Sequence, residues 1–137
     1  MKIKPVRAEV TIYDKQDPIG KIKSVIKSCD GVLVLGMERS HAYYLRDKEG
    51  SEKEEEWIHR KYTSSWLQLE AGIANALGKD VFVLCEKEIY DDGIFDRGWN
   101  TYPVIELRTI SEKNPELENF LIHLSKMVKE KSRQHSQ

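Results

Sequence analysis

Glu70 is the residue whose type and position point most clearly to chemistry. The sequence predicts a helix that begins near Ser65, stops at Gly78 and leads into a buried strand at Val81–Leu84. Glu70 lies four residues after Trp66, on the apolar stripe of that helix. A carboxylate in apolar surroundings costs free energy unless it is paired, protonated or open to a cleft. We therefore expect one of these three environments for the Glu70 carboxylate.

Two interpretations of Glu70 are open. In the first, a lysine or a backbone amide satisfies the carboxylate, or the helix is rotated so that the carboxylate reaches water. In the second, Glu70 points near the crevice beyond the carboxyl ends of the strands, where doubly wound α/β sheets bind ligands. A carboxylate placed there can stabilise an oxocarbenium-like centre, attack a sugar carbon or bind ribose hydroxyls. The second interpretation makes Glu70 the candidate catalytic residue.

The helix around Glu70 carries its own boundary signals. Ser65 can act as the N-cap with Gln68 three residues later, which is the pattern of a capping box. The inward stripe is expected to consist of Trp66, Leu69, Ile73, Ala74 and Leu77.

Strands and helices alternate before this helix. Residues Arg7–Asp14 predict a strand, and Pro18–Cys29 predicts an amphipathic helix with Asp17 as its N-cap. Val32–Leu35 is a short continuous apolar run, which is typical of a parallel strand buried on both faces. This alternation favours an α/β fold with a mostly parallel sheet.

The C-terminal third continues the pattern. Tyr102–Leu107 predicts a last strand, and Pro103 within it favours the edge of the sheet. Pro115 begins a last helix, and residues 133–137 are expected to form a frayed tail. No repeat or boundary divides the sequence, so we expect residues 1–132 to form one domain.

Residues Glu38–Lys61 interrupt the alternation. The segment is rich in charged residues and tyrosine, and we interpret it as a solvated, mobile connection with a short helix through Trp57. A second interpretation is a lid over a site, because long loops in compact domains are often functional. In that case Tyr43, Tyr44 and Trp57 can stack on a base.

Further site candidates follow the predicted strands. Gly36 and Met37 come directly after one strand, where a small residue lets a ligand approach the backbone, although a glycine there can equally be a simple strand terminator. Asp14 ends the first strand and can bind a ribose or form a turn. The four histidines show no pair at metal-ligand spacing on one helix, so we expect no metal site.

The composition bounds the class of protein. The 137 residues are 39% hydrophobic and 33% charged, with a formal net charge of -1. This balance suits one soluble domain and gives no electrostatic footprint for nucleic acid. No apolar run reaches the length of a membrane span. Cys29 and Cys85 adjoin predicted core segments, which favours free thiols in a reducing compartment, so we expect a cytoplasmic protein.

Two segments resemble known families. Ser64–Glu70 resembles the Ser-x-Trp-x-x-x-Glu element of Toll/interleukin-1 receptor (TIR) domains, and the run from Ile12 to Leu35 looks like the strand, loop, helix and buried strand before that element. Glu70–Leu84 is also similar to the Glu-Leu-Gly-x-Ala-x-Ala-x-Gly-Lys-Pro segment of nucleoside 2-deoxyribosyltransferases. Bacterial TIR-like nucleotide hydrolases and signal-making effectors of antiphage defence combine the two features.

The resemblance implies a flavodoxin-like, TIR-like three-layer fold and cleavage of an N-glycosidic bond. NAD is the leading substrate, through its nicotinamide–ribose bond, and no cofactor is implied. Glu70 matches the catalytic glutamate of the family, and Trp66, with Ser65 beside it, matches the part that shapes the pocket. The loop matching Asp14–Gly20 contacts nucleotide or a neighbouring subunit. Since TIR enzymes generally assemble to complete the site, a homo-oligomer is implied as well.

One departure from the family bears on activity. TIR domains place a central strand and a first helix before the segment that matches Ala8–Asp14, and only seven residues precede Ala8 here. Either the chain is a fragment, a partner strand fills the gap, or the first strand is redrawn. We therefore keep two alternatives to the N-glycosidase: a non-catalytic nucleotide-binding or self-assembling scaffold, and a nucleoside 2-deoxyribosyltransferase in which Glu70 attacks the sugar.

Overall fold

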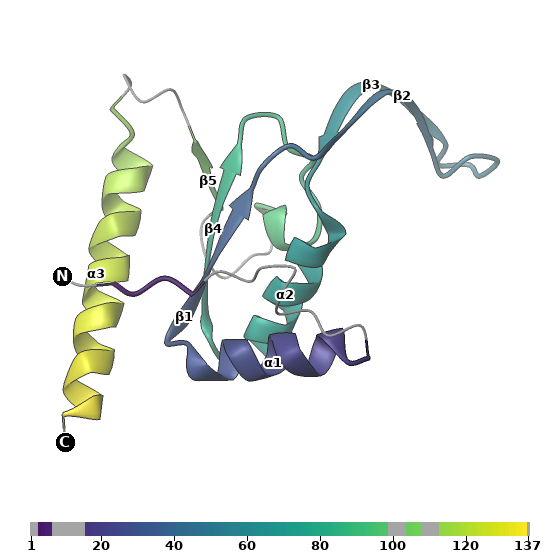
Figure 1. Cartoon of the computed structure of the whole chain (residues 1–137). Coiled ribbons are helices and arrows are strands. Elements are labelled where there is room, and N and C mark those ends of the chain that lie inside the picture. Colours follow the sequence, from purple (N-terminus) through teal and green to yellow (C-terminus); the bar gives the residue numbers. More distant parts are fainter. Residues whose placement is uncertain (1–2, 7–15, 99–103, 108–112, 137) are drawn as a thin grey trace.

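The computed structural model describes residues 3–6, 16–98, 104–107 and 113–136 (Figure 1). Helices alternate with strands, as the sequence predicts, apart from an additional pair of strands within residues 40–62. The elements are, in order, α1 (Pro18–Ser28), β1 (Gly31–Gly36), β2 (Ser40–Asp47), β3 (Glu55–Tyr62), α2 (Ser65–Ala76), β4 (Asp80–Glu86), the 3-10 turn η2 (Gly93–Phe95), β5 (Val104–Leu107) and α3 (Pro115–His135).

Three parallel strands form the central sheet in the order β1-β4-β5. The two apolar runs that predict strands pair in register, with Leu35 beside Leu84 and Leu84 beside Ile105. β4 lies in the middle, and five consecutive residues of this strand are buried. Among the described strands β5 lies at one edge, as Pro103 predicts, although Tyr102 and Pro103 themselves lie outside the described residues.

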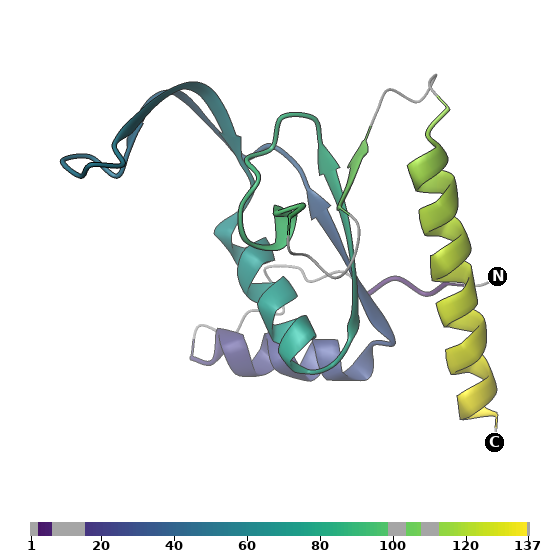
Figure 2. The ribbon, with the colours of Figure 1, turned by 180° about the vertical axis from the view of Figure 1, so that it is seen from behind.

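Helices pack on both faces of this sheet (Figures 1 and 2). On one face, α1 and α2 bury Ile26, Ala71 and Ala74 in a core cluster with Val83 of β4. On the other face, Phe120 of α3 joins a second cluster, which contains residues of β4 and β5. The chain is therefore a mixed α/β protein with a parallel sheet, compatible with a three-layer arrangement, and the predicted α/β class is confirmed.

β1 is less buried than its sequence predicts. Leu33 and Leu35 are 49% and 46% exposed, so the prediction of a strand buried on both faces is wrong for this strand. The physical reason is the position of α3, whose apolar side chains form a cluster with β4 and β5 that includes neither leucine.

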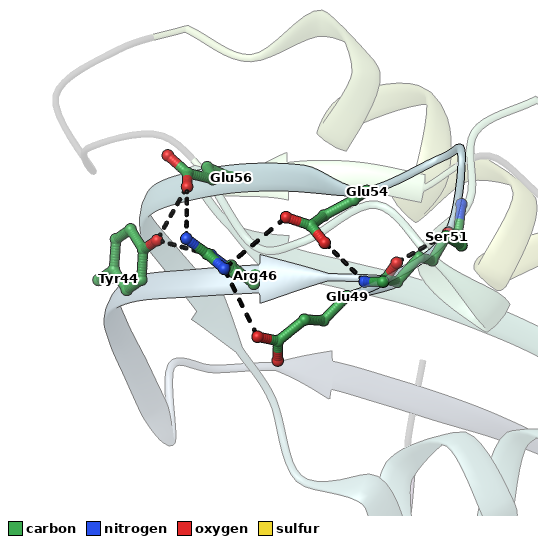
Figure 3. A network of polar contacts seen from close by, with 8 residues as sticks. Tyr44, Arg46, Glu49, Ser51, Glu54 and Glu56 are labelled. Atoms are coloured by element: carbon green, nitrogen blue, oxygen red, sulfur yellow. Dashed lines mark hydrogen bonds and ion pairs between the residues drawn. The ribbon is translucent and has the colours of Figure 1, made fainter.

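The segment Glu38–Lys61 is a β-hairpin, which corrects the prediction of a mobile connection with a short helix through Trp57. β2 and β3 pair antiparallel from Ser40 opposite Tyr62 to Asp47 opposite Glu55, and the ribbon projects away from the sheet and helices (Figure 1). Aromatic residues favour strands, and their distribution on both arms supports the pairing despite the high charge. Arg46 lies among Glu49, Glu54 and Glu56 in a polar network on the outer hairpin (Figure 3).

The predicted helix starts at α1 and α3 are confirmed. The Asp17 side chain accepts a hydrogen bond from the Gly20 amide at 2.9 Å, with Pro18 in the first turn. Pro115 begins α3, which continues to His135 through most of the segment predicted as a frayed tail. The predicted strand Arg7–Asp14 lies outside the described residues. Neither α3 nor any other described helix has the length and apolar character needed to span a membrane.

Candidate functional site

A cavity of about 180 Å³ opens at the start of α2. Three segments form it: the end of β3, the first turns of α2, and the stretch that follows β4. Its lining combines hydroxyls, an amide, a carboxylate and aromatic rings, from Tyr62, Thr63, Ser64, Ser65, Gln68, Ile89, Tyr90, Asp92 and Phe95. Ligand pockets usually measure about 300–1,000 Å³, so this cavity suits one part of a ligand, such as a sugar or a phosphate.

The start of α2 differs from the predicted capping box. Ser64, not Ser65, is the N-cap, and its hydroxyl accepts a hydrogen bond from the Trp66 amide at 3.3 Å. Ser65 is the first helical residue and lines the cavity. Gln68 does not cap the helix, because its side chain bonds to another segment. The Ser64 hydroxyl therefore already accepts one hydrogen bond in the cap, and both serines lie at the positive N-terminal end of α2, which favours an anionic or hydroxyl-bearing ligand.

Gln68 fixes the wall of the cavity formed by the segment after β4. Its amide nitrogen donates to the carbonyl oxygen of Asp92 at 3.2 Å, and its amide oxygen accepts from the Ile94 amide at 2.8 Å. Gly93 lies between these two partners with a φ of 55°, and a Cβ atom there would lie within 2.3 Å of Gln68 Oε1. A glycine is favoured at this position both by the left-handed backbone conformation and by the space that the Gln68 amide occupies.

Two tyrosines form the aromatic side of the cavity. The Tyr62 and Tyr90 rings lie edge to face with centroids 5.6 Å apart. The Tyr90 amide donates to the carbonyl oxygen of Lys61 at 2.9 Å, which ties the segment after β4 to β3. Behind Tyr90, the guanidinium of Arg60 lies between two rings, 3.9 Å from the centroid of Tyr90 and 3.9 Å from that of Trp57. Arg60 is 7% exposed and anchors the hairpin to the rest of the fold.

Asp92 is the carboxylate in the lining. Partial burial raises the pKa of its carboxyl group, and Asp91 and Asp96 raise it further, while the nearby Arg60 charge acts in the opposite direction. Its Oδ1 also accepts a hydrogen bond from Gln68 at 3.4 Å. Asp92 can therefore accept hydrogen bonds from ligand hydroxyls at the mouth of the cavity.

Glu70 lies on another side of α2. It is half-buried, as its position on the helix predicts, but it does not line the cavity. At about 100° per residue, Glu70 is turned by about 200° from Gln68, which faces the cavity. Ala71 and Ala74 form the face that packs on the sheet, whereas Trp66 and Leu69 of the predicted inward stripe are 44% and 37% exposed.

The remaining predicted site residues are distributed around this region. Gly36 ends β1, and a Cβ atom there would lie 2.5 Å from the Phe95 ring, so packing of Phe95 accounts for a glycine at this position. Met37 and Trp66 are substantially exposed and do not line the cavity. Asp14 lies outside the described residues. Of the residues predicted to contact ligand, the structure brings Ser65 to the cavity.

Sequence reasoning missed Tyr62, Tyr90 and Asp92. The sequence Asp91-Asp92-Gly93 is a turn signal, but nothing local indicates that this turn packs against α2. Among the described residues, no group of three or more metal-ligating side chains is arranged to hold a metal ion.

Comparison with known proteins gives no relative from which a role can be transferred. No family model, no curated protein and no solved structure matches this chain. Any assignment of function therefore depends on the residues and geometry described above.

Proposed function

We propose that this chain is a TIR-like, flavodoxin-like module that binds a nucleotide, with the cavity at the start of α2 taking a ribose or phosphate group. The observation that carries the proposal is the composition of the lining. Ser64 and Ser65 place hydroxyls at the N-terminal end of α2, the Asp92 carboxylate can accept hydrogen bonds from hydroxyls, and Tyr62 and Tyr90 give an aromatic surface. The resemblance of Ser64–Glu70 to the TIR element supports a nucleotide as the ligand.

The volume supports a bound fragment of the nucleotide rather than the whole molecule. A cavity of about 180 Å³ is below the range of pockets that enclose drug-sized ligands. The base or the second half of a dinucleotide would then extend over the rim. In TIR proteins a neighbouring subunit contributes to the site, and we propose a homo-oligomer in which a second copy covers the exposed part.

An N-glycosidase that cleaves the nicotinamide–ribose bond of NAD is the second candidate. It is favoured by the half-buried position of Glu70 on α2, at the spacing from Ser64 and Trp66 that resembles the TIR element. In this mechanism the Glu70 carboxylate stabilises positive charge on the ribose as nicotinamide leaves. It requires the ribose to reach the flank of α2 that carries Glu70, opposite Gln68.

Incubation with NAD separates the candidates. The binding module predicts saturable binding of NAD with intact nucleotide recovered by chromatography. Free nicotinamide, lost in Glu70→Gln and kept in Asp92→Asn, supports the glycosidase. Exchange of the base on a deoxynucleoside supports a 2-deoxyribosyltransferase. If NAD neither binds nor reacts at millimolar concentration, the nucleotide proposal is wrong.

A further inference from the structure

Two histidines that are not part of the cavity lining meet on the hairpin. His41 of β2 and His59 of β3 point toward each other across the ribbon, with Nε2 of His41 3.2 Å from Nδ1 of His59. They are 18 residues apart in sequence and lie on different strands, so helical spacing rules could not pair them. The antiparallel pairing of β2 with β3 brings the two rings together.

The spacing of the two nitrogens is that of two ligands on one metal ion. Tetrahedral Zn²⁺ binds imidazole nitrogens at about 2.0–2.1 Å, which places two such nitrogens about 3.3 Å apart. A shared ion would lie beside the line that joins the two nitrogens, about 35° off that line as seen from each nitrogen, so both rings must rotate for their lone pairs to point at the ion.

The surroundings of His41 hold its ring in the orientation that metal binding requires. Oε1 of Glu38 lies 3.4 Å from Nδ1 of His41, so the carboxylate favours a proton on Nδ1 and leaves Nε2 free to accept. The other oxygen of Glu38 is 3.5 Å from Lys61 Nζ, which leaves Oε1 for His41. Carboxylates in this position commonly orient metal-binding histidines.

Aromatic packing and backbone conformation restrict the pair further. The Tyr43 ring stacks on His41 with centroids 4.4 Å apart and planes within 6°, and it meets His59 edge to face at 5.4 Å. His59 has a φ of 58°, a left-handed conformation that non-glycine residues seldom adopt. Unusual backbone conformations of this kind persist where surrounding contacts enforce them and are concentrated at functional sites.

We propose that His41 and His59 form a two-histidine site for a divalent transition-metal ion of the zinc, copper or nickel class, with Glu38 orienting His41 from behind. Imidazole nitrogen is the ligand type that these ions prefer over Mg²⁺ or Ca²⁺. Since the described residues supply two ligands here, water or a group from another molecule completes the coordination. When the ion binds, Nδ1 of His59 loses its proton to solvent and Nε2 of the same ring takes up a proton. The His59 ring therefore stays neutral and the ion keeps its 2+ charge. This proposal does not depend on the proposed function.

The test uses the full chain and ZnCl₂ in a buffer that does not bind zinc. Histidine ring resonances are followed by NMR, and affinity is measured by calorimetry, with MgCl₂ in parallel. We expect saturable, one-to-one shifts of the His41 and His59 rings with Zn²⁺ and none with Mg²⁺. His41→Gln should weaken Zn²⁺ binding at least tenfold.

Matched variants separate ligation from folding. His59→Asn keeps a residue that tolerates the left-handed conformation, so the hairpin is retained while the ligand is lost, and affinity should again fall at least tenfold. Glu38→Gln should reduce affinity about 10- to 100-fold, as loss of an orienting carboxylate does. His123→Ala, on the exposed side of α3, is the control and should change nothing. Zn²⁺ affinity unchanged in His41→Gln and His59→Asn, or ring shifts confined to His123 and His135, would overturn the proposal.

Discussion

Replacement of Arg60 tests whether a buried cation stabilises the hairpin internally and, through Tyr90, holds it on the α/β body. Arg60→Ala removes a guanidinium that lies 3.9 Å from the centroids of Trp57 and Tyr90 and 3.9 Å from Asp47 Oδ2. It also removes the side-chain stem, in a residue that is 7% exposed. Because an isolated two-stranded hairpin is at best marginally stable in water, its order depends on such anchoring contacts.

The expected magnitude follows from the contacts. Each cation–π contact contributes about 0.5–1 kcal/mol when exposed and about 2 kcal/mol when desolvated, and the arginine is nearly buried between two rings. The ion pair with Asp47, at the limit of contact distance, adds less than about 1 kcal/mol. We therefore expect Arg60→Ala to lower the free energy of unfolding of the hairpin by about 2–4 kcal/mol.

Amide hydrogen exchange across β2 and β3 measures this effect directly, with urea denaturation as the global measure. Arg60→Lys should show an intermediate loss, because it keeps the charge but not the planar stacking group. Arg46→Ala is the matched control, since Arg46 makes exposed ion pairs on the same hairpin (Figure 3) that solvent screens, so its loss should leave hairpin protection close to that of the parent chain. Hairpin protection unchanged in Arg60→Ala, or an equal loss in Arg46→Ala, would refute the anchoring argument.

Three further predictions concern the region of the cavity. Gly93→Ala should weaken ligand binding and lower the melting temperature, because the added Cβ clashes with Gln68 and strains a left-handed residue; an unchanged melting curve would contradict this. Burial raises the pKa of Asp92, so the native state disfavours the charged form of this carboxyl group. The native state is therefore favoured by Asp92 when the pH is below the pKa of Asp92 in the unfolded chain. This contribution to stability is lost as the pH rises through the pKa of Asp92 in the native state. Asp92→Asn should therefore raise stability at pH 7 relative to the parent chain and give no gain at pH 3, as read from urea midpoints at both pH values. Glu70→Gln should leave nucleotide binding at the cavity within twofold, as measured by calorimetry, because Glu70 lies on another flank of α2; a tenfold loss would place Glu70 at the bound ligand.

The elements that the sequence predicts correctly are those with local signals. Asp17 followed by Pro18 determines the start of α1, and the apolar run at Val81–Leu84 predicts the central strand, because capping and burial act over a few residues. The hairpin was missed because its high charge hides the strand-forming residues. Only the pairing of the two arms provides the stabilising cross-strand contacts.

The site was predicted less well because it depends on tertiary packing. α2 approaches the sheet through the small residues Ala71 and Ala74, which turns the helix away from the orientation that the large residues Trp66 and Leu69 predict. Hydrophobic periodicity identifies the apolar stripe of a helix, but it does not reveal which residues of that stripe lie closest to the sheet. That rotation decides that Gln68, and not Glu70, faces the cavity.

The most direct test of the central claim is an NMR titration of the full chain with NAD, observed through backbone amide shifts. We predict saturable shifts that centre on the start of α2 and the segment after β4, around Ser64, Ser65, Tyr90 and Asp92. Saturable shifts elsewhere on the fold, with these residues unaffected, would contradict the assignment of the cavity as the nucleotide site.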